Sequence, residues 1–172
     1  TSTARNFHII INGEAKIERS ISTTASSSID GSTSVTRGEV IYDYDPTKGI
    51  LSKARGSKST EGNDIFNNRY LTNTTDTYSV VKGEAKLVYS ESETESWNTD
   101  GSHSKTTSWM KYEHTTGDED PSEFPANYSR EGKVIPGLCK GASSESHTEG
   151  EDIFAGTFTQ DVLTSYTSLI HG

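Results

Sequence analysis

The stretch VKGEAKLVY, residues 81–89, has the pattern of a half-buried β-strand. Its odd-numbered residues, from Val81 to Tyr89, are apolar or small, and residues 82, 84 and 86 are charged. Successive side chains of a strand point to opposite faces, so this alternation predicts one packed face and one solvated face. The chain around it should therefore form an antiparallel sheet.

The Gly-Glu-Ala-Lys of this stretch, at 83–86, also occurs 70 positions earlier, at 13–16. Between residues 13 and 42 a shift of 70 leaves 14 of 30 residues identical without a gap. A shift of 88 aligns Thr-Glu-Gly-X-Asp-Ile-Phe at 60–66 with the same motif at 148–154. The difference between the shifts is an 18-residue insertion at about 118–136. We expect one domain over 1–172, with repeat one at 7–75 and repeat two at 76–172.

The composition alone would favour disorder. The 172 residues carry 16 Lys and Arg against 25 Asp and Glu, a net charge of -9, and Leu, Ile, Val and Phe together make only 30 residues. Few large apolar residues with a high net charge are typical of unfolded chains. The collinear repeat argues instead for a fold. The acidic balance gives no basic patch for a nucleic acid, and no apolar run is long enough for a membrane-spanning helix.

Each repeat predicts four strands joined by tight turns. The first strand is expected over about Phe7–Thr24 and again over about Tyr78–Trp97. The turns after it, Asp30-Gly31 and Asp100-Gly101, favour hairpins because Gly accepts a positive φ.

The third strand is expected over Ile50–Ser57, after a turn at 45–49 that contains Pro and Gly. The fourth is expected to begin after Glu61-Gly62 and to include Ile65 and Phe66.

The fold class that follows is all-β: an internally duplicated antiparallel meander of about eight long strands. We expect an up-and-down barrel, because closing the sheet removes exposed edges. The alternative is a two-sheet sandwich with one repeat in each sheet.

The predicted interior mixes small residues with aromatic ones. Its small members are Gly13, Ala15, Ala54, Gly56, Gly83, Ala85 and Ala142. So few bulky residues would not fill a barrel, and an aromatic-lined cavity suits an apolar ligand. The expected ligand-binding residues are Tyr42, Tyr44, Phe66, Tyr78, Tyr112 and Tyr166. Two alternatives are that these tyrosines only pack across strands, or that a related subunit in a homo- or hetero-oligomer covers them.

Two glycosylation sequons and the start of the chain point to an extracellular protein. Asn73 is expected in a turn between the repeats and Asn127 in the insertion, both on surface loops. A chain beginning at Thr1 without a leader fits a mature secreted protein. The single cysteine, Cys139, excludes an internal disulfide and is expected to be buried on a strand.

No arrangement of residues matches a catalytic signature, a metal site or a cofactor motif. The sequence therefore predicts a secreted, non-enzymatic glycoprotein that binds or carries an apolar small molecule, carotenoid- or lipid-like, as a storage or egg-fluid type carrier. The alternative is a lectin or adhesion module that binds a glycan through Trp97 and Trp109. A pore-forming hairpin is the third class, although the strand faces lack the apolar lipid side that it requires.

Overall fold

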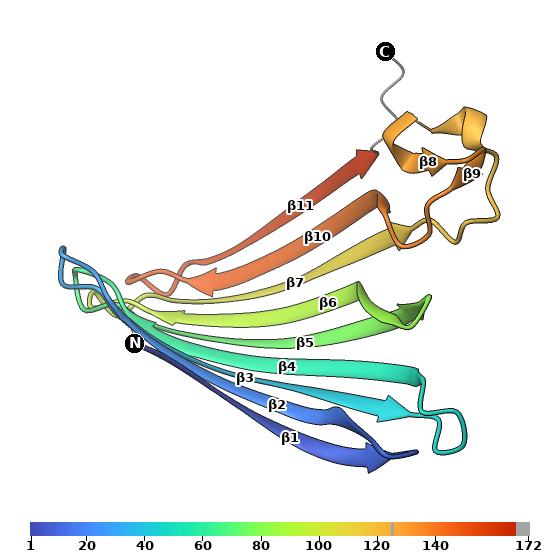
Figure 1. Cartoon of the computed structure of the whole chain (residues 1–172). Helices are drawn as coiled ribbons and strands as arrows, with labels where there is room; N and C mark the ends of the chain where they lie inside the picture. Colours follow the sequence, from blue (N-terminus) through green and yellow to red (C-terminus); the bar gives the residue numbers. More distant parts are fainter. Residues whose placement is uncertain (125, 168–172) are drawn as a thin grey trace.

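Nine strands form one antiparallel sheet in the computed structural model, which describes residues 1–124 and 126–167 (Figure 1). The strands are β1 (Ser2–Ile11), β2 (Glu14–Ser27), β3 (Thr33–Tyr44), β4 (Leu51–Asn63), β5 (Arg69–Val81), β6 (Glu84–Trp97), β7 (His103–His114), β10 (Cys139–Glu151) and β11 (Thr157–Thr167). A separate two-stranded hairpin contains β8 (Ser129–Arg130) and β9 (Lys133–Val134). The all-β, antiparallel fold expected from the sequence is confirmed.

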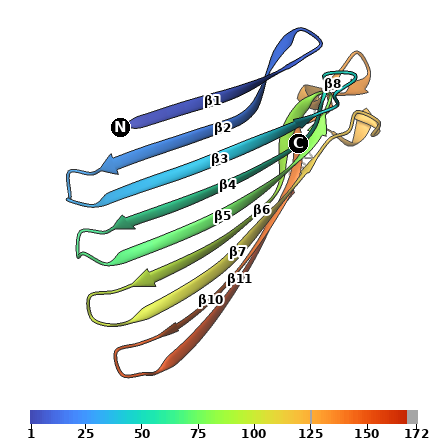
Figure 2. The same cartoon turned by 90° about the horizontal axis from the view of Figure 1, so that it is seen from below.

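The sheet is open, so the barrel prediction is wrong. The strand order is β1-β2-β3-β4-β5-β6-β7-β10-β11, with β1 and β11 at the two edges. Figures 1 and 2 show one curved layer whose edges do not meet. Strands of both repeats lie in this one sheet rather than in two packed sheets. Strand number gives a physical reason: in a nine-stranded meander β1 and β11 run in the same direction, so closure would need a parallel pair, which is slightly weaker than an antiparallel one.

The predicted first strand of each repeat is in fact two strands joined by a tight turn. The first break is at Asn12-Gly13, with φ of 53° and 81°, and the second is at Lys82-Gly83, with φ of 52° and 85°. Two consecutive residues with positive φ form the hairpin turn that suits twisted strands. Gly13 and Gly83 therefore belong to turns, not to an interior face.

The turn after β4 also corrects the prediction. The Asp64 carboxylate accepts hydrogen bonds from the backbone N–H groups of Phe66 and Asn68, at 2.8 and 2.9 Å. These bonds hold Ile65 and Phe66 in the turn, and β5 begins only at Arg69. Figure 2 shows this hairpin in a row with the β2–β3, β6–β7 and β10–β11 hairpins at one end of the sheet.

The insertion lies at the opposite end of the sheet (Figure 1). It contains two short 3-10 helices, η1 (Pro121–Glu123) and η2 (Ala126–Tyr128), besides β8 and β9. The fully buried Thr115 ties it to the sheet, because its hydroxyl donates to the carbonyl of Ile135 at 2.6 Å and accepts from the N–H of Leu138 at 3.0 Å.

Equivalent strands of the two repeats have matching bounds. A shift of 70 carries β2 onto β6 and β3 onto β7, and a shift of 88 carries β4 onto β10. The same shifts carry the end of β1 onto the end of β5 and the start of β5 onto the start of β11. Strands β1, β5 and β11 therefore occupy equivalent places in the pattern.

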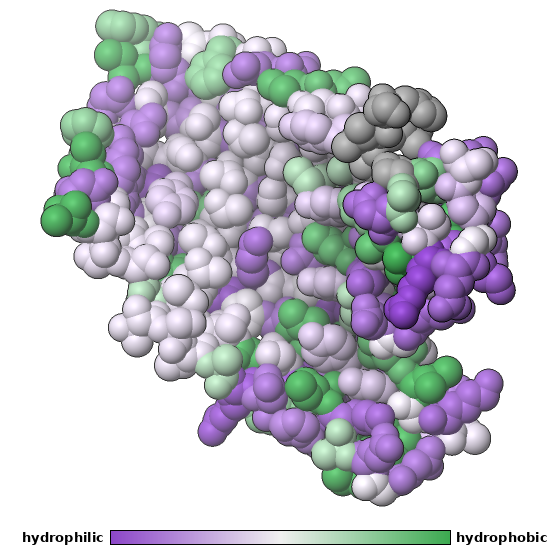
Figure 3. Space-filling model, turned by 45° about the horizontal axis from the view of Figure 1, so that its top comes forward, coloured by the Kyte–Doolittle hydropathy of each residue, from purple (hydrophilic) through white to green (hydrophobic). Residues whose placement is uncertain are grey.

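The register divides the sheet into two different faces. The small-residue face carries the even-numbered residues of β3, β5, β7 and β11. It also carries the even-numbered residues of β4 from residue 54 onward and of β10 from residue 142 onward. Lys58 and Asp76 are the only Lys, Arg, Asp or Glu among these strand residues. The other side, here called the charged face, carries ion pairs such as Arg37–Glu61 and Arg55–Asp43. Figure 3 shows a face whose middle is mostly pale, with the strongest purple toward the rim.

The single layer has almost no core of its own. Of the hydrophobic residues that the structure describes, Ala54 and Val134 are buried, at 0% and 3% exposure. The solvent-accessible surface is 11370 Å², whereas a compact 18.7 kDa chain would expose about 8,300 Å². The excess, about 3,100 Å², reflects the single open layer.

Candidate ligand-binding face

Four of the predicted ligand-binding tyrosines lie in one row across the small-residue face. Tyr42 pairs with Ala54, which pairs with Tyr78, which pairs with Leu87. The β6–β7 pairing ends at Tyr89–Lys111; the next residue of β7, Tyr112, pairs with Ala142, and Ala142 pairs with Tyr166 on the edge strand. We call these seven residues the tyrosine row. Its six inter-strand steps of about 4.8 Å make a length of about 29 Å.

Large and small residues alternate along the row, and the large ones cover the small ones. Ala54, between Tyr42 and Tyr78, has no exposed surface. The ring of Tyr78 also lies close to Gly56, whose added Cβ would be 3.4 Å from a ring carbon. Burial, with smaller effects of Asp76 and Tyr42, raises the pKa of the Tyr78 phenol, so the hydroxyl remains a neutral donor across the physiological range.

The other two predicted ligand-binding residues lie elsewhere. Tyr44 is one row further along β3, and its hydroxyl donates to the carbonyl of Ile17 at 2.9 Å. Burial raises its pKa as well. The structure does not bring Phe66 to the tyrosine row: it is 70% exposed in the β4–β5 turn, about 30 Å along the strand from Ala54.

Two hollows adjoin the tyrosines of the two repeats. One, of about 300 Å³, is lined by Met110, Tyr112 and Val162 with serines of β6, β7 and β10. The other, of about 420 Å³, is lined by Ile10, Tyr42 and Tyr44 near the β1 edge. Both combine apolar walls with a few hydroxyl groups, which is the composition of small-molecule sites.

A ladder of threonines crosses the middle of the small-residue face. Seven threonines pair in succession across seven strands: Thr24, Thr36, Thr60, Thr72, Thr94, Thr106 and Thr148. Three side-chain hydrogen bonds of 2.9 to 3.0 Å join them in pairs. The sequence prediction missed this ladder, although it repeats with the shifts of 70 and 88. Except for Lys58 and Asp76, the middle of the face is uncharged.

His114 lies at the end of the small-residue face that the tyrosine row occupies, and one polar atom of its side chain has no hydrogen-bond partner among the described residues. This atom, Nδ1, is buried. Burial, helped by the charge of Lys86, lowers the pKa of this imidazole, so it is neutral at pH 7. A neutral Nδ1 here could accept from, or donate to, a polar group of a ligand.

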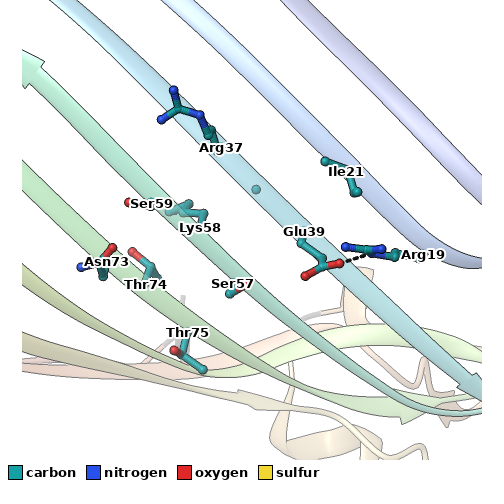
Figure 4. A pocket seen from close by; sticks show the side chains of 11 residues that line it. Arg19, Ile21, Arg37, Glu39, Ser57, Lys58, Ser59, Asn73, Thr74 and Thr75 are labelled. Atoms are coloured by element: carbon teal, nitrogen blue, oxygen red, sulfur yellow. Dashed lines mark hydrogen bonds and ion pairs between the residues drawn. The ribbon is translucent and has the colours of Figure 1, made fainter.

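A third hollow, on the charged face, surrounds the first sequon. It measures about 390 Å³ and spans β2 to β5. Figure 4 shows the Arg19–Glu39 pair and Arg37 on the neighbouring strands β2 and β3. Asn73 lies on β5, two strands from β3. Asn73 is exposed in the middle of β5, so its expected place in a turn is wrong. A glycan on Asn73 would project from the charged face and leave the tyrosine row free.

The second sequon and the cysteine lie near the insertion. Asn127 is exposed in η2, where the sequence predicted a surface loop. Cys139 is also exposed, at the start of β10, so its predicted burial is wrong. The bulge between Cys139 and Gly141 moves this strand end out of the regular register.

The two tryptophans have different surroundings. Trp97 already packs against other side chains: the guanidinium of Arg69 lies 5.3 Å from its ring and the His103 ring lies 5.6 Å away. Trp109 pairs with Glu91 and Glu145 on the charged face, opposite the serines, Met110 and Tyr112 that line the hollow of about 300 Å³. A sugar could stack on Trp97 only by displacing the Arg69 or His103 contact.

Neither metal-site nor membrane-helix geometry occurs in the described residues. Within 1–124 and 126–167 no three His, Cys, Asp or Glu side chains form a group able to hold a metal ion. No helix in the same residues is long and apolar enough to cross a membrane.

Comparisons with family models, with curated proteins and with solved structures found no match to this chain.

Proposed function

We propose that this chain is a subunit of a secreted, non-enzymatic glycoprotein assembly that binds an apolar small molecule, carotenoid- or lipid-like, along the tyrosine row. The observation that carries the proposal is the row itself: four tyrosines, alternating with Ala54, Leu87 and Ala142, on a face with almost no charge. Aromatic rings bind flat or elongated apolar molecules by dispersion, and phenolic hydroxyls orient them.

The shape of the face supports an elongated ligand. The row is about 29 Å long, and a hollow lies near either part of it, one beside Tyr42 and one beside Tyr112. Both sequons are exposed, Asn73 on the charged face and Asn127 in the insertion, which is compatible with glycosylation in a secreted protein. Glycans at these positions would not cover the tyrosine row.

A lone sheet would leave the ligand open to water, so the proposal includes assembly. The excess surface of about 3,100 Å² is larger than the roughly 800 Å² that each partner buries in a typical stable interface. A second subunit over or beside the small-residue face would enclose the ligand. We propose a homo- or hetero-oligomer of related subunits for this reason, with a storage or carrier role.

Titration with cis-parinaric acid, a fluorescent conjugated fatty acid, tests the ligand. We expect saturable binding to protein from which native lipid has been extracted, and at least a tenfold weaker affinity for the Tyr42→Ser, Tyr78→Ser double variant. Tyr89→Ser is the matched control, because Tyr89 is a β6 tyrosine that pairs with Lys111 on the charged face. Equal affinity of all three proteins would contradict the site.

A carbohydrate-binding module is the second candidate. Trp109, on the charged face between Glu91 and Glu145, is its candidate sugar-stacking residue, because Arg69 and His103 already contact the ring of Trp97. Binding of the assembled protein to a glycan array, abolished by Trp109→Ala, would support this function instead.

A further inference from the structure

Exposed large hydrophobic residues within the main sheet are confined to its two edge strands. Of the described strand residues of this class, three lie on β1 and four lie on β11. The four are Phe158, Val162, Leu163 and Tyr166. The remaining members are in hairpin turns or connecting loops. The seven inner strands have no exposed large hydrophobic residue, so the exposed apolar surface of the sheet lies on its two edge strands.

Strand β11 lacks the usual protection of a sheet edge. It has eleven residues without proline, lysine or a bulge, and Asp161 is its single charged residue. Natural proteins block such edges with charges, prolines or bulges, because the free N–H and C=O groups pair with any suitable strand. The Asp161 carboxylate is held inward, toward β10, by a 2.6 Å contact with Nδ1 of His147.

The direction of the strands decides which edges can meet. In this nine-stranded meander β1 and β11 are parallel to each other, so pairing β11 with β1 of another copy, with the small-residue faces on one side, gives a parallel pair. A twofold axis that brings β11 against β11 gives an antiparallel pair and keeps the small-residue face continuous. Self-complementary contacts of this kind are the commonest way in which identical subunits associate.

We propose that this chain forms a twofold dimer by antiparallel pairing of β11 with β11 of a second copy, in the register centred on Val162. Residues 157 and 167 are equally far from Val162, so the backbone pairs along the whole strand. Phe158 then faces Tyr166 of the second copy and Val162 faces Val162. Asp161 faces Leu163 rather than another carboxylate. The proposal deepens the assembly of the proposed function but does not depend on its ligand.

The other edge is less suited to self-pairing. An antiparallel β1 pair centred on Asn6 places Ile9, Ile10 and Ile11 opposite Thr3, Ser2 and Thr1. Aromatic and aliphatic pairs stabilise neighbouring strands more than such mixed pairs do. Strand β11 is therefore better suited than β1 to pair with a second copy of itself.

Charge substitutions at the centre of the register test the dimer. We expect wild-type protein to sediment as a dimer of about 37 kDa, twice the 18.7 kDa chain. Val162→Lys should raise the dimer dissociation constant at least tenfold, because two lysines would face each other. A mixture of Val162→Lys with Val162→Glu should recover the dimer. Ile10→Lys, at an exposed position on the β1 edge, is the control and should dimerise like the wild type.

Disulfide cross-linking keeps the test independent of the folding of the lysine variant. In a Cys139→Ser background, Val162→Cys should oxidise to a covalent dimer, since directly opposed residues have Cα atoms about 4.5–5.5 Å apart. A monomeric wild type, a Val162→Lys dimer of unchanged affinity, loss of the dimer in Ile10→Lys, or no cross-link at residue 162 would each overturn the proposal. Loss of cis-parinaric acid binding with an intact dimer would affect only the ligand.

Discussion

Tyr42 and Tyr78 stand on opposite sides of Ala54, because each is its direct cross-strand partner on the small-residue face. Ala54 is fully covered as a result, in a sheet that has almost no other buried apolar residue. The tyrosines therefore have two roles here: they form the row proposed to bind a ligand, and they supply what local core the sheet possesses.

Removing the Tyr78 ring should destabilise the isolated chain. Tyr78→Ala uncovers Ala54 and Gly56, and we expect the free energy of unfolding to fall by about 2 kcal/mol, less than for a fully buried aromatic residue. Urea denaturation followed by circular dichroism measures it. Tyr166→Ala is the control, because Tyr166 is 63% exposed on the edge strand, and a loss as large as that of Tyr78→Ala would contradict the packing described.

Gly62 should not tolerate a side chain. A Cβ at this position would lie 2.5 Å from the carbonyl oxygen of Thr33 and 2.6 Å from the Tyr70 hydroxyl. We expect Gly62→Ala to lower the thermal midpoint, with a cost of about 1–3 kcal/mol from overpacking. At Gly141 the nearest atom would be 3.5 Å away, so Gly141→Ala should change the midpoint much less. Equal midpoints for the two variants would show that Tyr70 does not lie over Gly62.

The insertion should loosen in acid through Glu119. Burial opposes the charge of this carboxylate, but hydrogen bonds from the N–H groups of Thr116 and Gly117 and from Lys140 outweigh it and lower its pKa to about 2. A depressed pKa stabilises the folded state above the ordinary value of 4.5, and this contribution is lost as the pH falls from 4.5 toward 2.

Glu119→Gln should remove that pH dependence and cost about 1.5–3 kcal/mol at pH 7. Hydrogen exchange of the Thr116 and Gly117 amides measures the local effect. Exchange rates that are the same in the variant and the wild type at pH 7 would exclude the two backbone hydrogen bonds to Glu119.

His147 should titrate at a higher pH than an ordinary histidine. Its hydrogen bond with Asp161 is the largest effect and raises the pKa. Burial, the next largest effect, opposes this rise, and the charges of Asp161, Glu149 and Glu145 add to it. The pair therefore stabilises the β10–β11 contact at low pH, and this contribution is lost as the pH rises through the raised pKa. An NMR titration should show a pKa above 6.5 that falls in Asp161→Asn. A value unaffected by that substitution would mean that the pair does not form in solution.

Local pattern was enough to predict antiparallel strands and the turns at Asp30-Gly31, 45–49 and Asp100-Gly101, but not the other hairpin turns or how the sheet ends. The alternation near Leu87 and the Asp100-Gly101 turn depend on neighbouring residues only. Closure depends on whether β1 can pair with β11, more than 140 residues apart, and no local pattern reports that. The Asn12-Gly13 and Lys82-Gly83 turns add two strands to the eight expected, but β5 joins the expected fourth strand of repeat one to the start of repeat two. The resulting nine strands leave the two edges parallel.

Four of the proposed ligand-binding residues lie together because the predicted strand parity was right for them. Tyr42, Tyr78, Tyr112 and Tyr166 share a face because each is an even-numbered residue of its strand in the same register. Phe66 was misplaced because the Asp64 side chain forms a turn that stops the strand, a contact that composition does not reveal. The threonine ladder was missed because it requires the register of seven strands at once, which turn lengths fix only after every turn is known.

Native mass spectrometry of the protein purified under non-denaturing conditions tests the central claim most directly, that this sheet is completed by another subunit and an apolar ligand. We expect a multiple of the glycosylated chain, with the dimer as its smallest unit, plus a non-covalent mass that organic solvent removes. A monomer carrying only glycan would contradict the account.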